Sequence, residues 1–254
     1  MKTTAIVTGA SSGFGKAIAK EISEDYNLVL LGRRQKRLDE LKSELESITE
    51  VHTIIQDIRD YKENFKLVDS LPLNFKNIEV LVNNAGLALG LDSAESANWN
   101  DWQQMIDTNI VGLTSLTRSI LPELIKNSSG HIINIGSIAG AWPYPGGNVY
   151  GATKAYVAQF SRNLRADLNG KNIRVTNIEP GLAETEFSVV RFDGDKSKAD
   201  SVYKNTQPLI AEDIARAAHW VLKQPRHVNI NSLEIMPTQQ SWGPLAIDRS
   251  DPLN

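Results

Sequence analysis

The amino-acid sequence predicts an α/β protein: a Rossmann-type doubly wound parallel sheet of about seven strands, with helices on both faces. Three observations support this fold class. Strand-like and helical patterns alternate along the chain, several strand-like runs are apolar on both faces, and a glycine-rich turn joins the first strand to the first helix. Such alternation is typical of βαβ units, whose crossover helices cover both sides of a parallel sheet.

The strand-like runs are short and rich in β-branched residues, and longer helical patterns separate them. The predicted strands cover 3–8, 27–32, 51–56, 78–82, 130–136, 172–178 and 228–235. The predicted helices cover 15–25, 35–48, 60–71, 99–126, 150–169 and 211–223. No linker divides this alternation, so we expect one domain over 1–254, with a substrate-covering lobe at 182–210.

Composition excludes several classes of function. A formal net charge of −3 gives no electrostatic reason to expect a nucleic-acid partner or an anionic membrane. The chain has no cysteine, which excludes disulfides and thiol catalysis, and its four histidines lack metal-ligand spacing, so we expect no metal. No signal-like segment or bilayer-length apolar run is present, and we expect a soluble cytoplasmic enzyme.

The glycine-rich turn follows the first predicted strand in the spacing G-x-x-x-G-x-G, at Gly9, Gly13 and Gly15. Glycines allow the backbone to approach a ligand closely, and the following helix offers free N–H groups to a phosphate. The alternative is an ordinary glycine-rich turn between a strand and a helix. The other loop residues that we place at the phosphates are Ser11, Ser12 and Phe14.

A second motif combines a hydroxyl, a phenol and an ammonium. Tyr150 follows Ser137 by thirteen positions, and Lys154 follows Tyr150 by four. On a helix, Tyr150 and Lys154 share one face, and a nearby cation favours the phenolate and so lowers the pKa of a tyrosine. Ser137 would hold a substrate oxygen while Tyr150 exchanges a proton with it. Taken alone, the pair is more simply explained as two exposed residues on one helix.

Several motifs follow predicted strand ends. They are Gly9, Asp57, Asn83, Ser137 and Pro180. Ligands of doubly wound sheets bind beyond the carboxyl ends of the strands, so these residues are expected to meet at one edge.

With these motifs assembled, the chain resembles a classical short-chain dehydrogenase/reductase over nearly its whole length. The motifs are T-G-A-S-S-G-F-G at 8–15, Asp57, N-N-A-G at 83–86, Asn109, Ser137, Tyr150, Lys154 and Pro180-Gly181. Within that family it is similar to bacterial NADP-dependent 3-hydroxy acid dehydrogenases, which include serine and allo-threonine dehydrogenases. The segments that suggest this subgroup lie at 86–90, 141–154, 179–187 and 190–195.

The resemblance implies roles for further residues. Asn109 would bind a water that links Lys154 to solvent, although it could instead bond locally to backbone. Lys154 would also bond the nicotinamide ribose. The remaining expected cofactor contacts are Asp57 and Ile58 at the adenine, Asn83 and Ala85 along the adenosine ribose, and Gly181 at the nicotinamide, with Gly86 and Pro180 as further cofactor-binding residues. Asp57 also has a plain reading as the N-cap of the next helix.

The end of the second predicted strand indicates the form of the cofactor. Enzymes that bind NAD commonly place a carboxylate there, whereas this chain has Arg33 and Arg34. Two guanidiniums suit a 2′-phosphate, so we expect NADP to be preferred over NAD by at least about tenfold. Many NADP-binding relatives carry a basic residue in the glycine loop, where this chain has Ser12. The alternative is that Arg33 and Arg34 belong to a solvated helix start.

The resemblance also implies a substrate site. A small hydroxy acid needs a cation for its carboxylate, and Arg191 in the 182–210 lobe is the candidate, with Tyr144 and Asn148 lining the pocket. Arg191 could instead be a solvated loop charge. The tail from Pro237 to Asn254 is expected to reach a neighbouring subunit's site, because homotetramers are common in the family.

These expectations converge on hydride transfer between NADP(H) and a small 3-hydroxy acid, such as serine, allo-threonine or 3-hydroxypropionate, or its semialdehyde. One alternative is a reductase of another small aldehyde or ketone, such as sulfoacetaldehyde or a diketone. A different class is a non-catalytic NADP-binding sensor, but such proteins usually lose the tyrosine or the lysine, and both are present here.

Overall fold

The computed structural model describes residues 2–242 and contains a seven-stranded sheet in the order β3-β2-β1-β4-β5-β6-β7. Every neighbouring pair of strands is parallel. The strands are β1 (Thr4–Thr8), β2 (Asn27–Gly32), β3 (Val51–Ile55), β4 (Ile78–Asn83), β5 (Gly130–Ile135), β6 (Ile173–Pro180) and β7 (Ser232–Ile235). The strand order reverses direction between β1 and β4, which is the switch point where such folds bind ligands.

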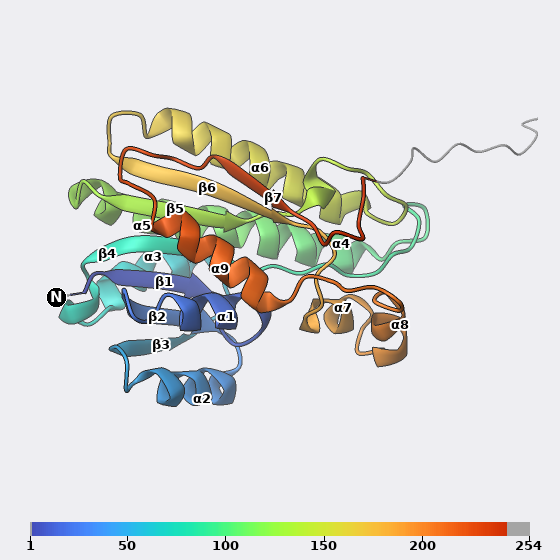
Figure 1. The fold of residues 1–254 in the computed structure, drawn as a ribbon, viewed down its shortest axis with the longest axis horizontal. Helices are drawn as coiled ribbons and strands as arrows, with labels where there is room; N and C mark the ends of the chain where they lie inside the picture. The colour runs from blue at the N-terminus through green and yellow to red at the C-terminus, as the bar shows by residue number, and fades with distance from the viewer. Residues whose placement is uncertain (1, 243–254) are drawn as a thin grey trace, which may run out of the picture.

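Helices cover both faces of the sheet (Figure 1). They are α1 (Gly13–Glu21), α2 (Gln35–Leu45), α3 (Tyr61–Ser70), α4 (Trp99–Ile106), α5 (Leu113–Lys126), α6 (Asn148–Asp167), α7 (Glu186–Arg191), α8 (Lys196–Ser201) and α9 (Ala211–Leu222). Short 3-10 turns occupy η1 (Leu73–Phe75) and η3 (Ile138–Gly140), and a π-helix occupies η2 (Asp107–Gly112). None of the helices within residues 2–242 is long and apolar enough to span a bilayer.

Alternating strand side chains form two hydrophobic cores, one on each face. In β1, Val7 packs with residues of α1, α2 and α9, whereas its neighbour Ile6 packs with residues of α3, α5 and α6. Because successive strand residues point to opposite faces, a strand buried on both sides must be apolar throughout. The predicted doubly wound fold is confirmed.

The last strand is shorter than predicted because side chains replace part of its backbone pairing. Strand β7 begins at Ser232, although the apolar pattern suggested 228. Before it, the Asn229 amide group accepts a hydrogen bond from Val175 N (2.8 Å) and donates one to Val175 O (2.9 Å). An asparagine can satisfy a neighbouring strand's backbone in this way, so the segment follows β6 without joining the ladder.

The 182–210 lobe contains two short helices that are absent from the predicted elements. Thr185 caps α7 by accepting a bond from Phe187 N (3.2 Å), and Asp195 caps α8 by accepting one from Lys198 N (3.1 Å). Both helices have six residues, too few for periodicity to reveal them. They project from one end of the molecule, apart from the two main helical layers (Figure 1).

Candidate active site

A cavity of about 300 Å³ lies where the chain leaves the carboxyl ends of β1 to β6. The predicted site residues that line it are Gly9, Ser11, Ser12, Gly13, Phe14, Arg33, Arg34, Asp57, Ile58, Ala85, Gly86, Ser137, Tyr150, Lys154, Pro180 and Gly181. Those that do not line it are Gly15, Asn83, Asn109, Tyr144, Asn148 and Arg191. Four of the five strand-end residues, Gly9, Asp57, Ser137 and Pro180, therefore meet at one edge, and Asn83 does not join them.

The glycine loop needs its glycines for two different reasons. Gly9 and Gly13 have φ of +63° and +51°, a region that side-chain-bearing residues rarely adopt. At Gly15 a Cβ atom would lie 2.6 Å from the Gly9 carbonyl oxygen, so this glycine allows α1 to pack tightly behind the loop. The loop thus presents backbone and the first turn of α1 to the cavity, which suits a phosphate.

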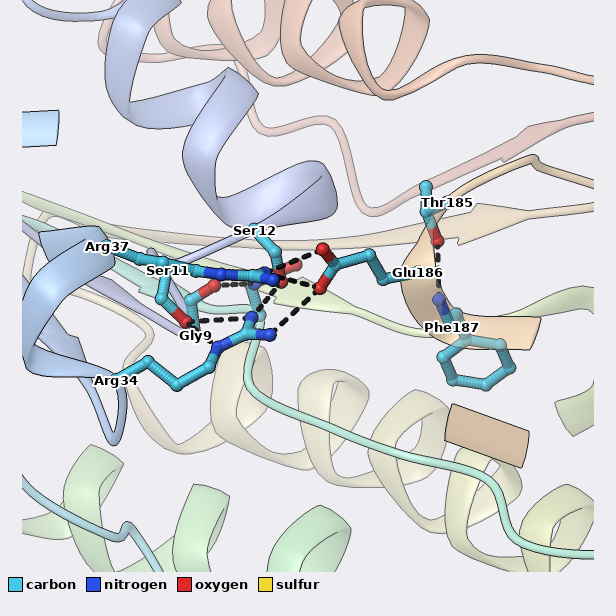
Figure 2. Close-up of polar contacts among 9 residues, drawn as sticks. Gly9, Ser11, Ser12, Arg34, Arg37, Thr185, Glu186 and Phe187 are labelled. Carbon is cyan, nitrogen blue, oxygen red and sulfur yellow. Dashed lines mark hydrogen bonds and ion pairs between the residues drawn. The ribbon is translucent and has the colours of Figure 1, made fainter. Parts of the chain in front are cut away.

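Arg34, which lines the cavity, forms a polar cluster with Ser11, Ser12 and Glu186 (Figure 2). Its Nε and Nη2 donate to Ser11 Oγ (3.1 and 3.0 Å), and Nη2 also donates to Ser12 Oγ (2.5 Å). Its Nη1 donates to Glu186 Oε2 (2.9 Å), and Arg37 Nη1 donates to both Glu186 oxygens (2.6 and 2.7 Å). Ser12 thus receives a hydrogen bond from Arg34.

Glu186 and Arg37 were not predicted as site residues. Glu186 lies 152 positions after Arg34, so no local pattern could join the two. Burial alone would raise the pKa of Glu186, but hydrogen bonds from Arg34 and Arg37 outweigh it and hold this pKa below its ordinary value. The carboxylate is therefore charged at neutral pH.

Arg33 turns toward a second carboxylate. Its Nη1 lies 3.6 Å from Asp57 Oδ2, and Arg59 Nη2 lies 2.7 Å from the same oxygen. Burial would raise the pKa of Asp57, but hydrogen bonds from Arg59 lower it overall. The N-cap of α3 is Asp60, whose Oδ1 accepts bonds from Lys62 N and Glu63 N, so the N-cap alternative for Asp57 is wrong.

The expectation that Asn83 faces the ribose is not met, because its side chain is buried and does not line the cavity. Its Nδ2 donates to Thr117 Oγ1 and Asn134 Oδ1, both at 2.8 Å, inside the layer formed by α5 and β5. Asn84 lines the cavity instead, and its Nδ2 donates to Thr8 O (2.9 Å). Neighbouring residues point to opposite sides of a strand, so a shift of one position moves the side chain across the sheet.

Ser137 and Tyr150 both line the cavity. Ser137 Oγ caps η3 by accepting a hydrogen bond from Ala139 N (3.1 Å), which leaves its own hydrogen for an acceptor in the cavity. Tyr150 is only 8% exposed. Burial raises its pKa to about 12, against the opposing effects of a hydrogen bond with Ser137 and the charge of Arg191. Tyr150 is thus a proton-bearing phenol at neutral pH.

The sequence suggested that Lys154 would lower the pKa of Tyr150, but in the structure burial raises this pKa overall, and the groups that lower it are Ser137 and Arg191. Lys154 Nζ lies 5.9 Å from the centroid of the Tyr150 ring and donates to Ile135 O (2.8 Å). Burial in turn lowers the pKa of Lys154 to about 8, because a buried ammonium loses its hydration. Near neutral pH both groups carry their protons.

Asn109 lies in the π-helix, where a single long helix over 99–126 was expected. Its Oδ1 accepts from Leu87 N and its Nδ2 donates to Leu87 O, both at 2.9 Å, with a further bond to Thr153 Oγ1 (3.0 Å). The amide therefore fixes the loop after β4 against α6, which carries Tyr150. The alternative of a local backbone bond is wrong, because Leu87 is 22 positions away.

The substrate candidates separate into two groups. Arg191 Nη2 donates to Tyr144 Oη (2.6 Å), and its guanidinium carbon lies 5.5 Å from the centroid of the Tyr150 ring. The alternative of a solvated loop charge for Arg191 is therefore wrong. Asn148 instead donates to Asp92 O (3.1 Å), which holds the start of α6 against the loop before α4.

The first residues of the lobe also belong to the site. Thr185 and Phe187 line the cavity, and the Phe187 ring lies 5.7 Å from that of Tyr150 between centroids. Sequence reasoning missed both, although a threonine directly before a short helix is a recognisable N-cap signal. In the C-terminal tail, Gln240 Oε1 accepts from Leu182 N (2.7 Å), and residues 243–254 lie outside the part of the chain that the structure describes.

The histidine, aspartate and glutamate side chains of residues 2–242 are dispersed. No group of three or more histidine, aspartate or glutamate side chains there could hold an ion. His131 is buried in β5, where its Nε2 lies 2.8 Å from Thr176 Oγ1, and burial lowers its pKa to about 3. It is a neutral core residue.

Comparison with known proteins agrees with this architecture. A family model described as short chain dehydrogenase matches residues 3–195. The NADP-dependent 3-hydroxy acid dehydrogenase YdfG of Escherichia coli K12 is 52% identical over 96% of this chain and 98% of that protein. Sulfoacetaldehyde reductase 2 of Chromohalobacter salexigens is 49% identical over 98% of this chain and the whole of that protein, 100%.

Solved structures show the same fold. The closed form of a serine dehydrogenase complexed with NADP+ superposes with a TM-score of 0.94 at 50% identity, covering 98% of this chain and 100% of the other. The serine dehydrogenase of Escherichia coli gives a TM-score of 0.81 at 46% identity, covering 94% and 100%. The fold, the cavity at the strand ends and these relatives lead to one conclusion: the chain belongs to the short-chain dehydrogenase family.

Proposed function

We propose that this protein transfers a hydride between NADP(H) and a small 3-hydroxy acid, such as serine, allo-threonine or 3-hydroxypropionate, or the corresponding semialdehyde. One observation carries the proposal: Tyr150, Ser137 and Lys154 line the same cavity as the Arg34 cluster. A proton donor and an anion site therefore share one binding cleft.

The residues around the cavity fit the phosphorylated cofactor. Arg34 and the hydroxyls of Ser11 and Ser12 supply donors for a 2′-phosphate, and the glycine loop supplies backbone N–H groups for the diphosphate. Thr108 Oγ1 also lines the cavity, buried and without a hydrogen-bond partner in the described structure, which suits a polar ligand atom. When bound, NADPH supplies the hydride. We propose the other cofactor contacts as they were predicted from the sequence, except that Asn84 takes the place of Asn83 at the adenosine ribose.

The proton chemistry belongs to the chain's own side chains. With a pKa raised to about 12, Tyr150 keeps its proton at neutral pH and donates it to the carbonyl oxygen that becomes the alcohol. Ser137 donates a hydrogen bond to the same oxygen and polarises the carbonyl. The Lys154 ammonium stabilises the phenolate that Tyr150 leaves behind.

Arg191 is the proposed partner of the substrate's acid group. It lies on the Tyr150 side of the site and is oriented by Tyr144 Oη and Gly90 O. A guanidinium binds a carboxylate and a sulfonate by the same geometry. Reduction of sulfoacetaldehyde is therefore the second candidate function, and the relative of that name, 49% identical over 98% of this chain, favours it. A diketone lacks the anion that Arg191 would bind.

The test is oxidation of NADPH by the purified protein with malonic semialdehyde, sulfoacetaldehyde and a neutral diketone of similar size. The proposal predicts the highest kcat/KM with the carboxylate-bearing aldehyde and little turnover of the diketone. The highest kcat/KM with sulfoacetaldehyde would establish the second candidate. Binding of NADPH without turnover of any of them would favour the non-catalytic sensor and contradict both enzymes.

We also propose that the protein is a cytoplasmic homotetramer. The single domain over 1–254, with its substrate-covering lobe at 182–210, remains part of the proposal. The assembly proposal is supported by the tetramers common in the family, and the location by a chain without cysteine. Light scattering of the purified protein and fractionation of the source cells test the two statements separately.

A further inference from the structure

We propose that Glu186 is a cofactor-selecting residue: its carboxylate competes with the 2′-phosphate of NADP(H) for Arg34 and Arg37. This inference rests on the proposed use of NADP. Glu186 lines the same cavity as Arg34, and Figure 2 shows it pointing from the start of α7 onto both guanidiniums. The carboxylate thus binds the groups that the sequence indicates for the phosphate.

The donors of Arg34 show why the two anions compete. Its Nε donates to Ser11, its Nη2 to Ser11 and Ser12, and its Nη1 to Glu186. The protein itself therefore occupies four N–H groups of Arg34. A guanidinium has five N–H groups, and a phosphate binds it best in a bidentate contact. At least one existing partner must therefore yield when a phosphate binds.

The serines and the glutamate differ in how they respond to an incoming anion. The hydroxyls of Ser11 and Ser12 can rotate and donate to the phosphate, so they can stay in place. The Glu186 carboxylate can only accept, and like charges held on one guanidinium repel each other. Glu186 is therefore the partner that leaves. Its side chain is 45% exposed, so it can turn into water at little cost.

Displacement of Glu186 also acts on the lobe. Glu186 is the first residue of α7, and the next residue, Phe187, lies against the ring of Tyr150 at 5.7 Å between centroids. Thr185, the residue before Glu186, caps the helix by accepting a hydrogen bond from Phe187 N. Releasing Glu186 therefore removes one of the contacts that hold the start of α7, the helix that ends at Arg191.

The experiment measures binding of two nicotinamide-free probes by calorimetry. 2′,5′-ADP carries the 2′-phosphate and 5′-ADP lacks it. In Glu186→Gln we expect the Kd for 2′,5′-ADP to fall about threefold to tenfold, because exposed ion pairs of this kind are weak competitors. The Kd for 5′-ADP should stay unchanged.

Glu184→Gln is the matched control. Glu184 lies two positions earlier on the lobe, is exposed, and makes no ion pair with any residue of the described structure. Its substitution removes the same charge, so equal gains in both variants would contradict the proposal and indicate a general field effect. An unchanged or weaker affinity of Glu186→Gln for 2′,5′-ADP would also overturn it.

Failure of the proposed function gives a different result. Wild-type protein that binds 2′,5′-ADP no more tightly than 5′-ADP contradicts the assignment of NADP, whatever the variants do. The competition is judged only by the change in the Kd for 2′,5′-ADP between the wild type and Glu186→Gln. The increase in affinity of Glu186→Gln for 2′,5′-ADP should also become smaller as the salt concentration rises, because screening weakens the interaction between exposed charges.

Discussion

Tyr150 and Lys154 show how burial sets the chemistry of single residues. Burial raises the pKa of Tyr150 to about 12 and lowers that of Lys154 to about 8, since each neutral form is favoured away from water. The charged lysine and the protonated tyrosine therefore coexist near neutral pH. This is the state required for a tyrosine that protonates a carbonyl oxygen.

The pH dependence of reduction should follow Lys154. As the pH rises through about 8, Lys154 loses the charge that stabilises the Tyr150 phenolate, so kcat/KM for aldehyde reduction should fall. Lys154→Arg keeps its charge across this range and should show no such fall, at a lower absolute rate. A wild-type profile of kcat/KM that stays flat from pH 7 to about 9 would contradict this role.

Cofactor preference should depend on Arg34. We expect Arg34→Ala to lower the ratio of kcat/KM with NADPH to that with NADH by about tenfold or more, because a charged bond to the 2′-phosphate is lost. Lys36→Ala, a charge removal two positions away in α2, is the control. Equal kcat/KM values of the wild type with NADPH and NADH would refute the assignment.

At the scale of elements, the π-helix η2 connects the site to the scaffold. Three hydrogen bonds from the Asn109 amide join η2 to the loop after β4 and to Thr153 of α6. A π-helix adds a residue to a turn and often occurs at functional sites. Here it places a buried amide between the loop that lines the cavity and the helix that carries Tyr150.

Removal of that amide should loosen the site. We expect Asn109→Ala to lower the free energy of unfolding by about 1–3 kcal/mol, because the backbone groups of Leu87 lose their partner. Turnover should fall as well, since the loop after β4 is no longer fixed. Denaturant titration checks the first effect, with Asn163→Ala on the exposed side of α6 as the control. Equal stabilities of the two variants would exclude this role.

At the scale of the whole molecule, alternation of elements was predictable and long-range pairing was not. Buried parallel strands are apolar on both faces, so a run such as Gly130–Ile135 predicts a strand of the sheet from its residues alone. The pairing of Arg34 with Glu186 spans 152 positions and depends on how the lobe folds. The choice between Asn83 and Asn84 needs strand register, and the pKa direction of Tyr150 needs burial. Each of these is a property of the packed molecule.

Acid stability is a property of the whole fold and should depend on His131. Burial lowers its pKa to about 3, below the ordinary value of 6.5, so the unfolded chain binds a proton that the folded chain does not. The contribution of His131 to the free energy of unfolding is then fully present above pH 6.5 and is lost as the pH falls toward 3, by about 1.4 kcal/mol per pH unit at most. His131→Gln should flatten this slope, and His227→Gln at the surface should not. Parallel slopes for the wild type and His131→Gln would contradict the account.

The central claim is that Tyr150 protonates the substrate of an NADPH-dependent reduction. The most direct test is kcat/KM for semialdehyde reduction by Tyr150→Phe, measured together with the Kd for NADPH. We predict a loss of about 10²–10⁴-fold or more in kcat/KM with the Kd nearly unchanged, because only the proton donor is removed. Tyr156→Phe, which removes a hydroxyl further along α6, should keep full activity. Turnover by Tyr150→Phe close to that of the wild type would contradict the mechanism.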